Sequence, residues 1–136
     1  MADQSPLENV PLFAGLKSRE RRELEANLHR REYAPGSEIL AEGEGGIAFF
    51  VLVEGEASVT RGGQELRKLG PGDYAGEMAL IDGDVRSASV AAATDVVVLG
   101  LTRLTFRPWV ERHPEVAWTL MRALVARLRE AEARAD

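Results

Sequence analysis

The residues best suited to chemistry lie between positions 76 and 88. Gly76 and Glu77 precede an apolar run at 78–81, and Arg86 follows Glu77 by nine residues. A helical turn that begins just after a glycine presents free backbone N–H groups, which attract anions. The planar guanidinium of Arg86 matches two oxygens of a phosphate, and Ser87 adds a hydroxyl beside it. This spacing predicts a small phosphate site.

The carboxylate of Glu77 indicates a second part of the same ligand. A carboxylate repels a phosphate but accepts hydrogen bonds from vicinal hydroxyls, such as those of a ribose. The segment therefore predicts a ligand with both a phosphate and a sugar hydroxyl. The alternative is that Glu77 and Arg86 form an ion pair that ties the fold together, in a site filled by its own side chains.

Other kinds of chemistry have little support in the composition. The chain has no cysteine, and its two histidines, His29 and His113, fall in expected helical or linker segments. A metal enzyme on a jelly roll would need two or three histidines from neighbouring strands. The net charge of −5 argues against broad nucleic-acid binding. We therefore expect no catalytic residue, no metal and no resident cofactor.

The elements that must position this segment follow from glycine density and hydrophobic period. Eleven of the 13 glycines lie between residues 36 and 83, among short apolar runs about ten residues apart. This pattern predicts a mainly β fold with flanking helices: an eight-stranded jelly-roll β-barrel over 31–102. A helical lead-in is expected over 5–30 and two helices over 103–136, the whole forming a single domain, 1–136.

The expected helices carry recognisable start signals. Ser18 is predicted to cap the first helix, and Thr102 a short one that runs to about Arg112. Pro114 opens a longer helix, because proline suits the first helical position. One side of this longer helix is apolar and is expected to be its packing side: Val116, Ala117, Leu120, Met121, Leu124, Val125 and Leu128. The tryptophans at 109 and 118 are expected to pack, with a partner contact open for Trp118.

The segment resembles the phosphate-binding cassette of cyclic nucleotide-binding domains, the family of catabolite activator protein, kinase A regulatory subunits and cyclic-nucleotide-gated channels. The matching features are Gly76-Glu77, the apolar run, the four-residue gap and Arg86-Ser87-Ala88. The resemblance extends to 42–44 before 49–55 and to the lead-in at 7–16. It covers nearly the whole chain and, with 15 arginines against two lysines, suggests a stand-alone bacterial member.

The resemblance implies a role for each residue of the segment. Glu77 would accept a hydrogen bond from the ribose 2′-hydroxyl, and the Gly76 backbone would approach the sugar. Arg86 would pair with the cyclic phosphate, with help from Ser87 and the backbone N–H of Ala88. The apolar run would contribute Met78 and Ala79 to the site.

The base of the nucleotide would be covered from the last helix. Arg127 is one candidate for this lid, and Leu124 and Leu128 are the others. Serine after the cassette arginine occurs in bacterial cAMP receptors, so Ser87 favours cAMP and leaves cGMP open. A stacked base contributes about 1–3 kcal/mol in nucleic-acid sites, enough to favour a closed helix.

The resulting hypothesis is a non-catalytic cyclic nucleotide sensor, cytoplasmic, which signals by movement of its C-terminal helix to an unidentified effector protein. It would be a monomer or a weak homodimer, without a membrane segment and, if full-length, without nucleic-acid binding. Two alternatives stay open. One is a degenerate fold that acts as an interaction module, and the other is a domain cut from a larger regulator or channel.

Overall fold

The computed structural model describes residues 5–41, 43–85 and 88–135. Contacts divide the chain into two compact units, one of residues 27–107 and one that joins residues 1–26 with 108–136. The first unit carries the strands and the helical turn of the predicted site. The second unit is helical. The predicted single domain of residues 1–136 stays a prediction.

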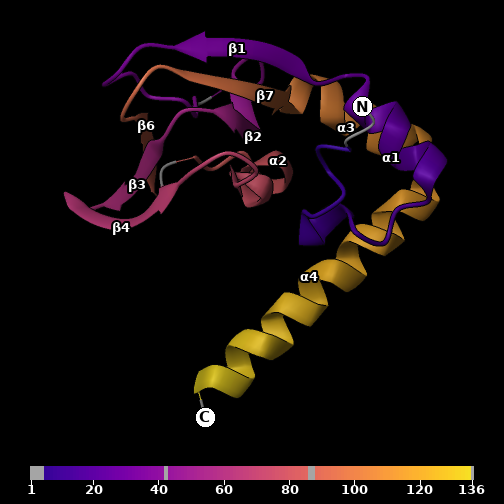
Figure 1. Ribbon diagram of the computed structural model, residues 1–136. Helices are drawn as coiled ribbons and strands as arrows, with labels where there is room; N and C mark the ends of the chain where they lie inside the picture. The colour runs from indigo at the N-terminus through magenta and orange to yellow at the C-terminus, as the bar shows by residue number, and fades with distance from the viewer. Residues whose placement is uncertain (1–4, 42, 86–87, 136) are drawn as a thin grey trace. The chain divides into compact units, whose positions relative to one another are not determined.

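The β unit consists of two antiparallel sheets (Figure 1). One sheet has the order β1-β7-β2-β5 and the other the order β4-β3-β6. The strands are β1 (His29–Tyr33), β2 (Ile47–Glu54), β3 (Ala57–Arg61), β4 (Gln64–Leu69), β5 (Tyr74–Ala75), β6 (Ser89–Ala92) and β7 (Val96–Thr102), with the helix α2 (Glu77–Asp82) between β5 and β6.

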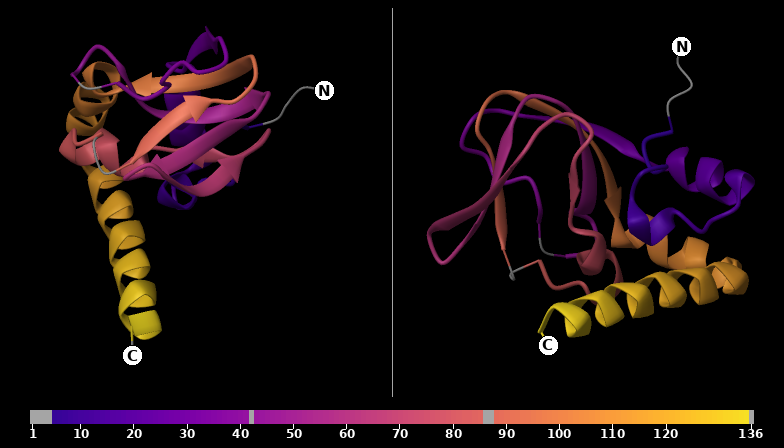
Figure 2. Two further views of the ribbon diagram at one scale, coloured as in Figure 1. Left: turned by 90° about the vertical axis from the view of Figure 1, so that its left-hand side faces the viewer. Right: turned by 60° about the horizontal axis from the view of Figure 1, so that its bottom comes forward.

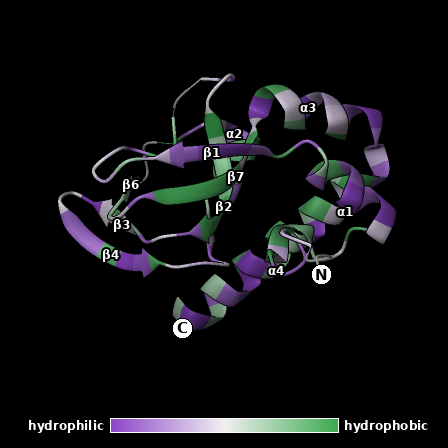
Figure 3. Ribbon diagram, turned by 45° about the horizontal axis from the view of Figure 1, so that its top comes forward, coloured by the Kyte–Doolittle hydropathy of each residue, from purple (hydrophilic) through white to green (hydrophobic). Residues whose placement is uncertain are grey.

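The core of this unit forms where the apolar sides of the strands meet. Strand β3 alternates, with Ala57 and Val59 buried and its other residues more exposed, as expected for a half-buried strand. Strand β2 is buried over its first six residues. Figure 3 shows that the strands differ in hydropathy: β2 and β7 are mostly hydrophobic, while β4 is hydrophilic. Burial of β2 and β7 in the middle of their sheet therefore fixes the scaffold for the segment that follows β5.

The prediction of an eight-stranded closed barrel is wrong in its strand count and closure. The described residues form seven strands in two open sheets, which Figure 2 shows from two further sides. The stretch at 36–41 pairs as an isolated bridge between Glu38 and Ala91. A tight turn precedes it, in which Ser37 N donates to Ala34 O (3.1 Å) and Gly36 has a φ of +89°. Because this turn takes up the start of the segment, its pairing is too short for a strand.

The helical unit is held by apolar packing and by one shared carboxylate. It contains the 3₁₀ helix η1 (Pro11–Phe13), α1 (Ser18–Glu25), the end of α3 (Arg103–Arg112) and α4 (Pro114–Ala135). Glu23 Oε1 accepts a hydrogen bond from Trp109 Nε1 (2.9 Å) and lies 3.1 Å from His113 Nε2. Trp109 is buried, as expected, whereas Trp118 is exposed, so its predicted packing role is wrong.

The predicted start signals of the two C-terminal helices are confirmed. Thr105 N donates to Thr102 Oγ1 (3.2 Å), and Pro114 is the first residue of α4. Helix α1 begins at Ser18 itself, so its cap is Lys17, whose N–H donates to the Glu20 carboxylate (2.9 Å). The prediction that Ser18 is the cap is therefore wrong by one residue, since Ser18 is the first residue of the helix.

The predicted apolar side of α4 is only partly buried. Val116 and Leu120 are buried, while Met121, Val125 and Leu128 are exposed. The sequence period gives the side of a helix correctly, but burial along that side depends on what the helix contacts.

Candidate ligand-binding site

The helical turn of the predicted site is fixed by its connection to β2. Strand β5 pairs with β2 through Ala75 and Phe50, and the chain then enters α2 through Gly76. Gly76 has a φ of +93°, and a Cβ at this position would lie 2.0 Å from the carbonyl oxygen of Ala48. Only glycine allows both this backbone conformation and this approach. The turn is therefore built directly against the β2 backbone.

Helix α2 places its side chains in two directions. Glu77 is buried, with 8% of its surface exposed, and Ala79 and Leu80 of the same helix are buried as well. Met78 is 55% exposed. The Glu77 carboxylate, with so little exposure, is the charged group of α2 that comes directly after Gly76 in the chain. Sequence reasoning placed Met78 and Ala79 in the site, and their side chains lie in different environments.

The C-terminal end of α2 is closed by a second glycine and by an arginine from α3. Gly83, with a φ of +76°, donates its N–H to Ala79 O (2.9 Å). Arg103 Nε donates to Leu80 O (3.2 Å) and Arg103 Nη2 to Ile81 O (3.1 Å). Sequence reasoning did not single out Arg103, because its contact with α2 spans 22–23 residues of chain.

The two predicted phosphate-binding side chains, Arg86 and Ser87, lie outside the described residues. Their chain neighbours Val85 and Ala88 both line a cavity of about 530 Å³. The other lining residues are Glu38, Leu40, Ala41, Ser89 and Val90. Of the predicted site residues that the structure describes, Ala88 is the one that lines this cavity.

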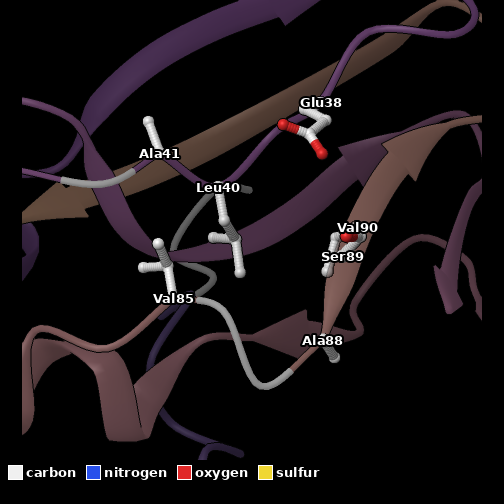
Figure 4. A pocket seen from close by; sticks show the side chains of 7 residues that line it. All are labelled: Glu38, Leu40, Ala41, Val85, Ala88, Ser89 and Val90. Atoms are coloured by element: carbon white, nitrogen blue, oxygen red, sulfur yellow. The ribbon is translucent and has the colours of Figure 1, made fainter. Parts of the chain in front are cut away.

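Figure 4 shows how this cavity is assembled from two parts of the chain. Glu38, Leu40 and Ala41 come from the segment before β2, and the remaining residues come from β6 and the stretch leading to it. The lining is mixed: most of the lining residues are apolar, but polar atoms, including those of Glu38 and Ser89, make up about half of the exposed wall. Such a lining suits a small ligand that has both apolar and polar groups.

Sequence reasoning missed the residues from the segment before β2, although a signal was present. Ile39 is buried in the core, while Glu38 and Leu40 on either side of it line the cavity. Extended chain sends alternate side chains to opposite faces. The pattern Glu38-Ile39-Leu40 therefore indicated a lining face once the segment was known to be extended.

Arg127, the predicted lid residue, lies on α4 in the helical unit and is half-buried. Its role as a lid stays a prediction. Within the described ranges, no group of three His, Cys, Asp or Glu side chains could hold a metal ion. Nor does any helix in the described part of the chain have the length and apolar character needed to cross a membrane.

The described structure thus has a β unit that holds a cavity and a separate helical unit. The sequence model of the cyclic nucleotide-binding domain matches residues 30–113, which is more than half of the chain. The chain therefore belongs to the cyclic nucleotide-binding domain family.

Two curated relatives illustrate its place in this family. The cyclic AMP receptor protein of Thermus thermophilus is 38% identical over 135 residues, which are 96% of this chain and 62% of the relative. The cAMP-dependent protein kinase regulatory subunit of Aspergillus niger is 44% identical over 103 residues, 74% of this chain and 25% of the relative. The chain thus spans less than two thirds of either relative.

A solved structure matches over almost the full length of both chains. The N-terminal domain of a transcriptional regulator from Streptomyces coelicolor A3(2) superposes with a TM-score of 0.81 at 32% sequence identity. The match covers 96% of this chain and 94% of that domain. Membership in a family of cyclic nucleotide-binding regulatory domains is therefore supported by both sequence and fold.

Proposed function

We propose that this chain is a non-catalytic cAMP sensor domain, with its ligand held by residues 76–79, Arg86, Ser87 and Ala88. The observation that carries the proposal is the burial of Glu77 at the first position of α2, directly after a glycine that packs on the β2 backbone. A carboxylate in this position would accept a hydrogen bond from a ribose hydroxyl. The family membership supports the same ligand class.

The phosphate would be bound between the start of α2 and Arg86. Arg86 would supply a charge-assisted pair of hydrogen bonds, and Ser87 and the N–H of Ala88 would add neutral ones. Glu77 and Arg86 then have separate partners, the ribose and the phosphate. This division explains why one segment carries both charges.

The preference for cAMP rests on Ser87 and on the relatives. Two of them are described as a cyclic AMP receptor protein and as a cAMP-dependent kinase regulatory subunit. The cavity, whose lining includes the apolar side chains of Leu40, Val85 and Val90 beside polar groups, would receive a further part of the nucleotide. We propose that Arg127, or a leucine of α4, covers the base.

The signal would leave the domain through its last helix. A ligand that binds one arrangement of α4 more tightly shifts the population toward it. Helix α4 exposes Trp118, Met121, Val125 and Leu128, apolar side chains that an effector protein can recognise. The similarity to the first domain of a transcriptional regulator supports a place for this sensor within a larger regulatory system.

Isothermal titration with cAMP and cGMP tests the proposal. We expect cAMP to bind with a dissociation constant of about 1 μM or below, equivalent to about −8 kcal/mol, and cGMP more weakly. No heat and no rise in melting temperature with either nucleotide would refute ligand binding. That result would favour the second candidate, a member of the family that acts as an interaction module through the exposed side of α4.

The residue test uses Arg86→Ala with Arg30→Ala as its control. Loss of a buried charge partner costs about 3 kcal/mol, so the Arg86 variant should bind cAMP about 100-fold more weakly. Arg30 lies on β1, where its pair with Glu32 is exposed and lies apart from the cavity lining. Equal affinities for the two variants would show that the phosphate binds elsewhere.

A further inference from the structure

The contacts of Arg103 join α2 to the helix that leads out of the β unit. Arg103 is the first residue of α3, and two of its nitrogens donate to the consecutive carbonyls of Leu80 and Ile81. These carbonyls belong to the last turn of α2, which has six residues. The last four carbonyls of a helix have no partner within it. In so short a helix, the fork of Arg103 therefore satisfies a large share of the free acceptors.

The charge of Arg103 also suits its position. A cation near the C-terminal end of a helix is stabilised by the partial negative charge of the free carbonyls. The Arg103 side chain is 21% exposed, so water screens this attraction only in part. Hydrogen bonds and charge thus act on the same end of α2.

Gly83 lies against the guanidinium of Arg103. A Cβ at position 83 would lie 3.0 Å from Arg103 Nη1 and 3.3 Å from Arg103 Cζ, so the guanidinium would have to move by a few tenths of an ångström. The positive φ favours glycine at this position. The end of α2 and the side chain of Arg103 therefore form one packed unit.

A third segment fixes the start of α3. Leu104 N donates to Glu44 O (3.1 Å), and Arg103 Nη1 lies 3.9 Å from Glu44 Oε2. The Glu44 side chain is 57% exposed, so the ion pair itself adds little stability. The backbone hydrogen bond holds the first turn of α3, and Arg103 extends from that turn to α2.

We propose that Arg103 is a positioning residue that ties the occupancy of the nucleotide site to the first turn of α3. This inference rests on the proposed function, since it describes the regulation of the same site. A ligand that orders the start of α2 at Glu77 also orders its end, where the two carbonyls meet Arg103. The order then passes to residues 104–107 of α3. By reciprocity, a disturbed first turn of α3 weakens ligand binding.

The test compares Arg103→Met, Arg103→Lys and the control Arg112→Met in the full chain, with cAMP as the probe. Methionine keeps the unbranched apolar stem of the side chain but removes the guanidinium and its donors, and lysine keeps the charge and one donating group. Arg112 lies at the other end of α3 and is exposed. The readouts are the dissociation constant and the hydrogen exchange of the amides in 77–83 and 104–107.

We expect Arg103→Met to weaken cAMP binding about tenfold and to speed amide exchange in 77–83 without ligand. At saturating cAMP the variant should recover protection in 77–83 but not in 104–107, a split that a general loss of stability does not produce. Arg103→Lys should recover part of both effects, and Arg112→Met should match the wild type.

Two results overturn the inference. One is an Arg103→Met variant with wild-type affinity and wild-type exchange in 77–83. The other is a variant in which cAMP still protects 104–107 as in the wild type. If the wild type binds neither nucleotide, the proposed function fails, while faster exchange of 77–83 in ligand-free Arg103→Met still decides whether Arg103 holds α2.

Discussion

Replacement of Gly76 by alanine separates two physical costs at the entrance of α2. Gly76 and Gly72 share a φ of +93°, but their surroundings differ. A Cβ at position 72 meets nothing within 4 Å, whereas a Cβ at position 76 would lie 2.0 Å from Ala48 O. Gly72→Ala is therefore a matched control that has the same backbone strain without the collision.

The expected magnitudes follow from these distances. A left-handed conformation costs an alanine about 1–2 kcal/mol, and the lower entropy of the unfolded chain offsets about 0.4–1 kcal/mol. Gly72→Ala should therefore destabilise the protein by about 1 kcal/mol. In Gly76→Ala the backbone must shift by about 1 Å, since Cβ contacts below 3.0 Å essentially do not occur. Overpacking of this kind adds about 1–3 kcal/mol.

Urea unfolding followed by far-ultraviolet circular dichroism measures both variants. We expect Gly76→Ala to lose about 2–4 kcal/mol of unfolding free energy and to bind cAMP more weakly, because the shift displaces Glu77. Equal losses for the two variants would refute the reasoning, since they would show that α2 does not rest on the β2 backbone. A Gly72 variant that loses more than the Gly76 variant would refute it as well.

Two further predictions concern polar groups within each unit. Glu23→Ala removes the carboxylate that accepts a hydrogen bond from the N–H of the buried Trp109. The free energy of unfolding, measured in urea, should therefore fall by about 1–3 kcal/mol. A loss no larger than that of the exposed control Glu8→Ala would contradict the role of this hydrogen bond. Burial raises the pKa of the Tyr33 phenol above its ordinary value of 10.0, although the charge of Arg31 lowers it in part. The folded state therefore keeps the proton longer than the unfolded chain, and this contribution to stability, complete below pH 10.0, is lost as the pH rises through the folded pKa. Unfolding midpoints measured from about pH 9 to about pH 11 should fall more steeply for the wild type than for Tyr33→Phe, and parallel curves would show that the phenol is not desolvated.

The sequence alone determined the local features of this protein. The glycine before Glu77 predicted the entry to a helical turn, and Thr102 and Pro114 predicted the starts of two helices, all of which the structure has. These features depend on hydrogen bonds and φ values within a few residues. A pattern of neighbouring residue types is sufficient to indicate them.

Contacts between distant segments were decided by the tertiary structure. The stretch at 36–41 pairs with β6 through the bridge between Glu38 and Ala91, and Glu38 and Leu40 of this stretch line the cavity. Trp109 donates to Glu23, which is 86 residues away in the sequence, and Arg103 donates to carbonyls of α2 that are 22–23 residues away.

The physical reason is that a sequence pattern records the period of one segment but not its partner. Residue types near Gly76 indicate a turn, yet the need for glycine there comes from the carbonyl of Ala48, which only the pairing of β5 with β2 brings into contact. The sequence therefore specified the helical turn after Gly76, part of the proposed nucleotide site, through local residue types. The packing of that segment on β2 and its closure by Arg103 arise only in the folded β unit.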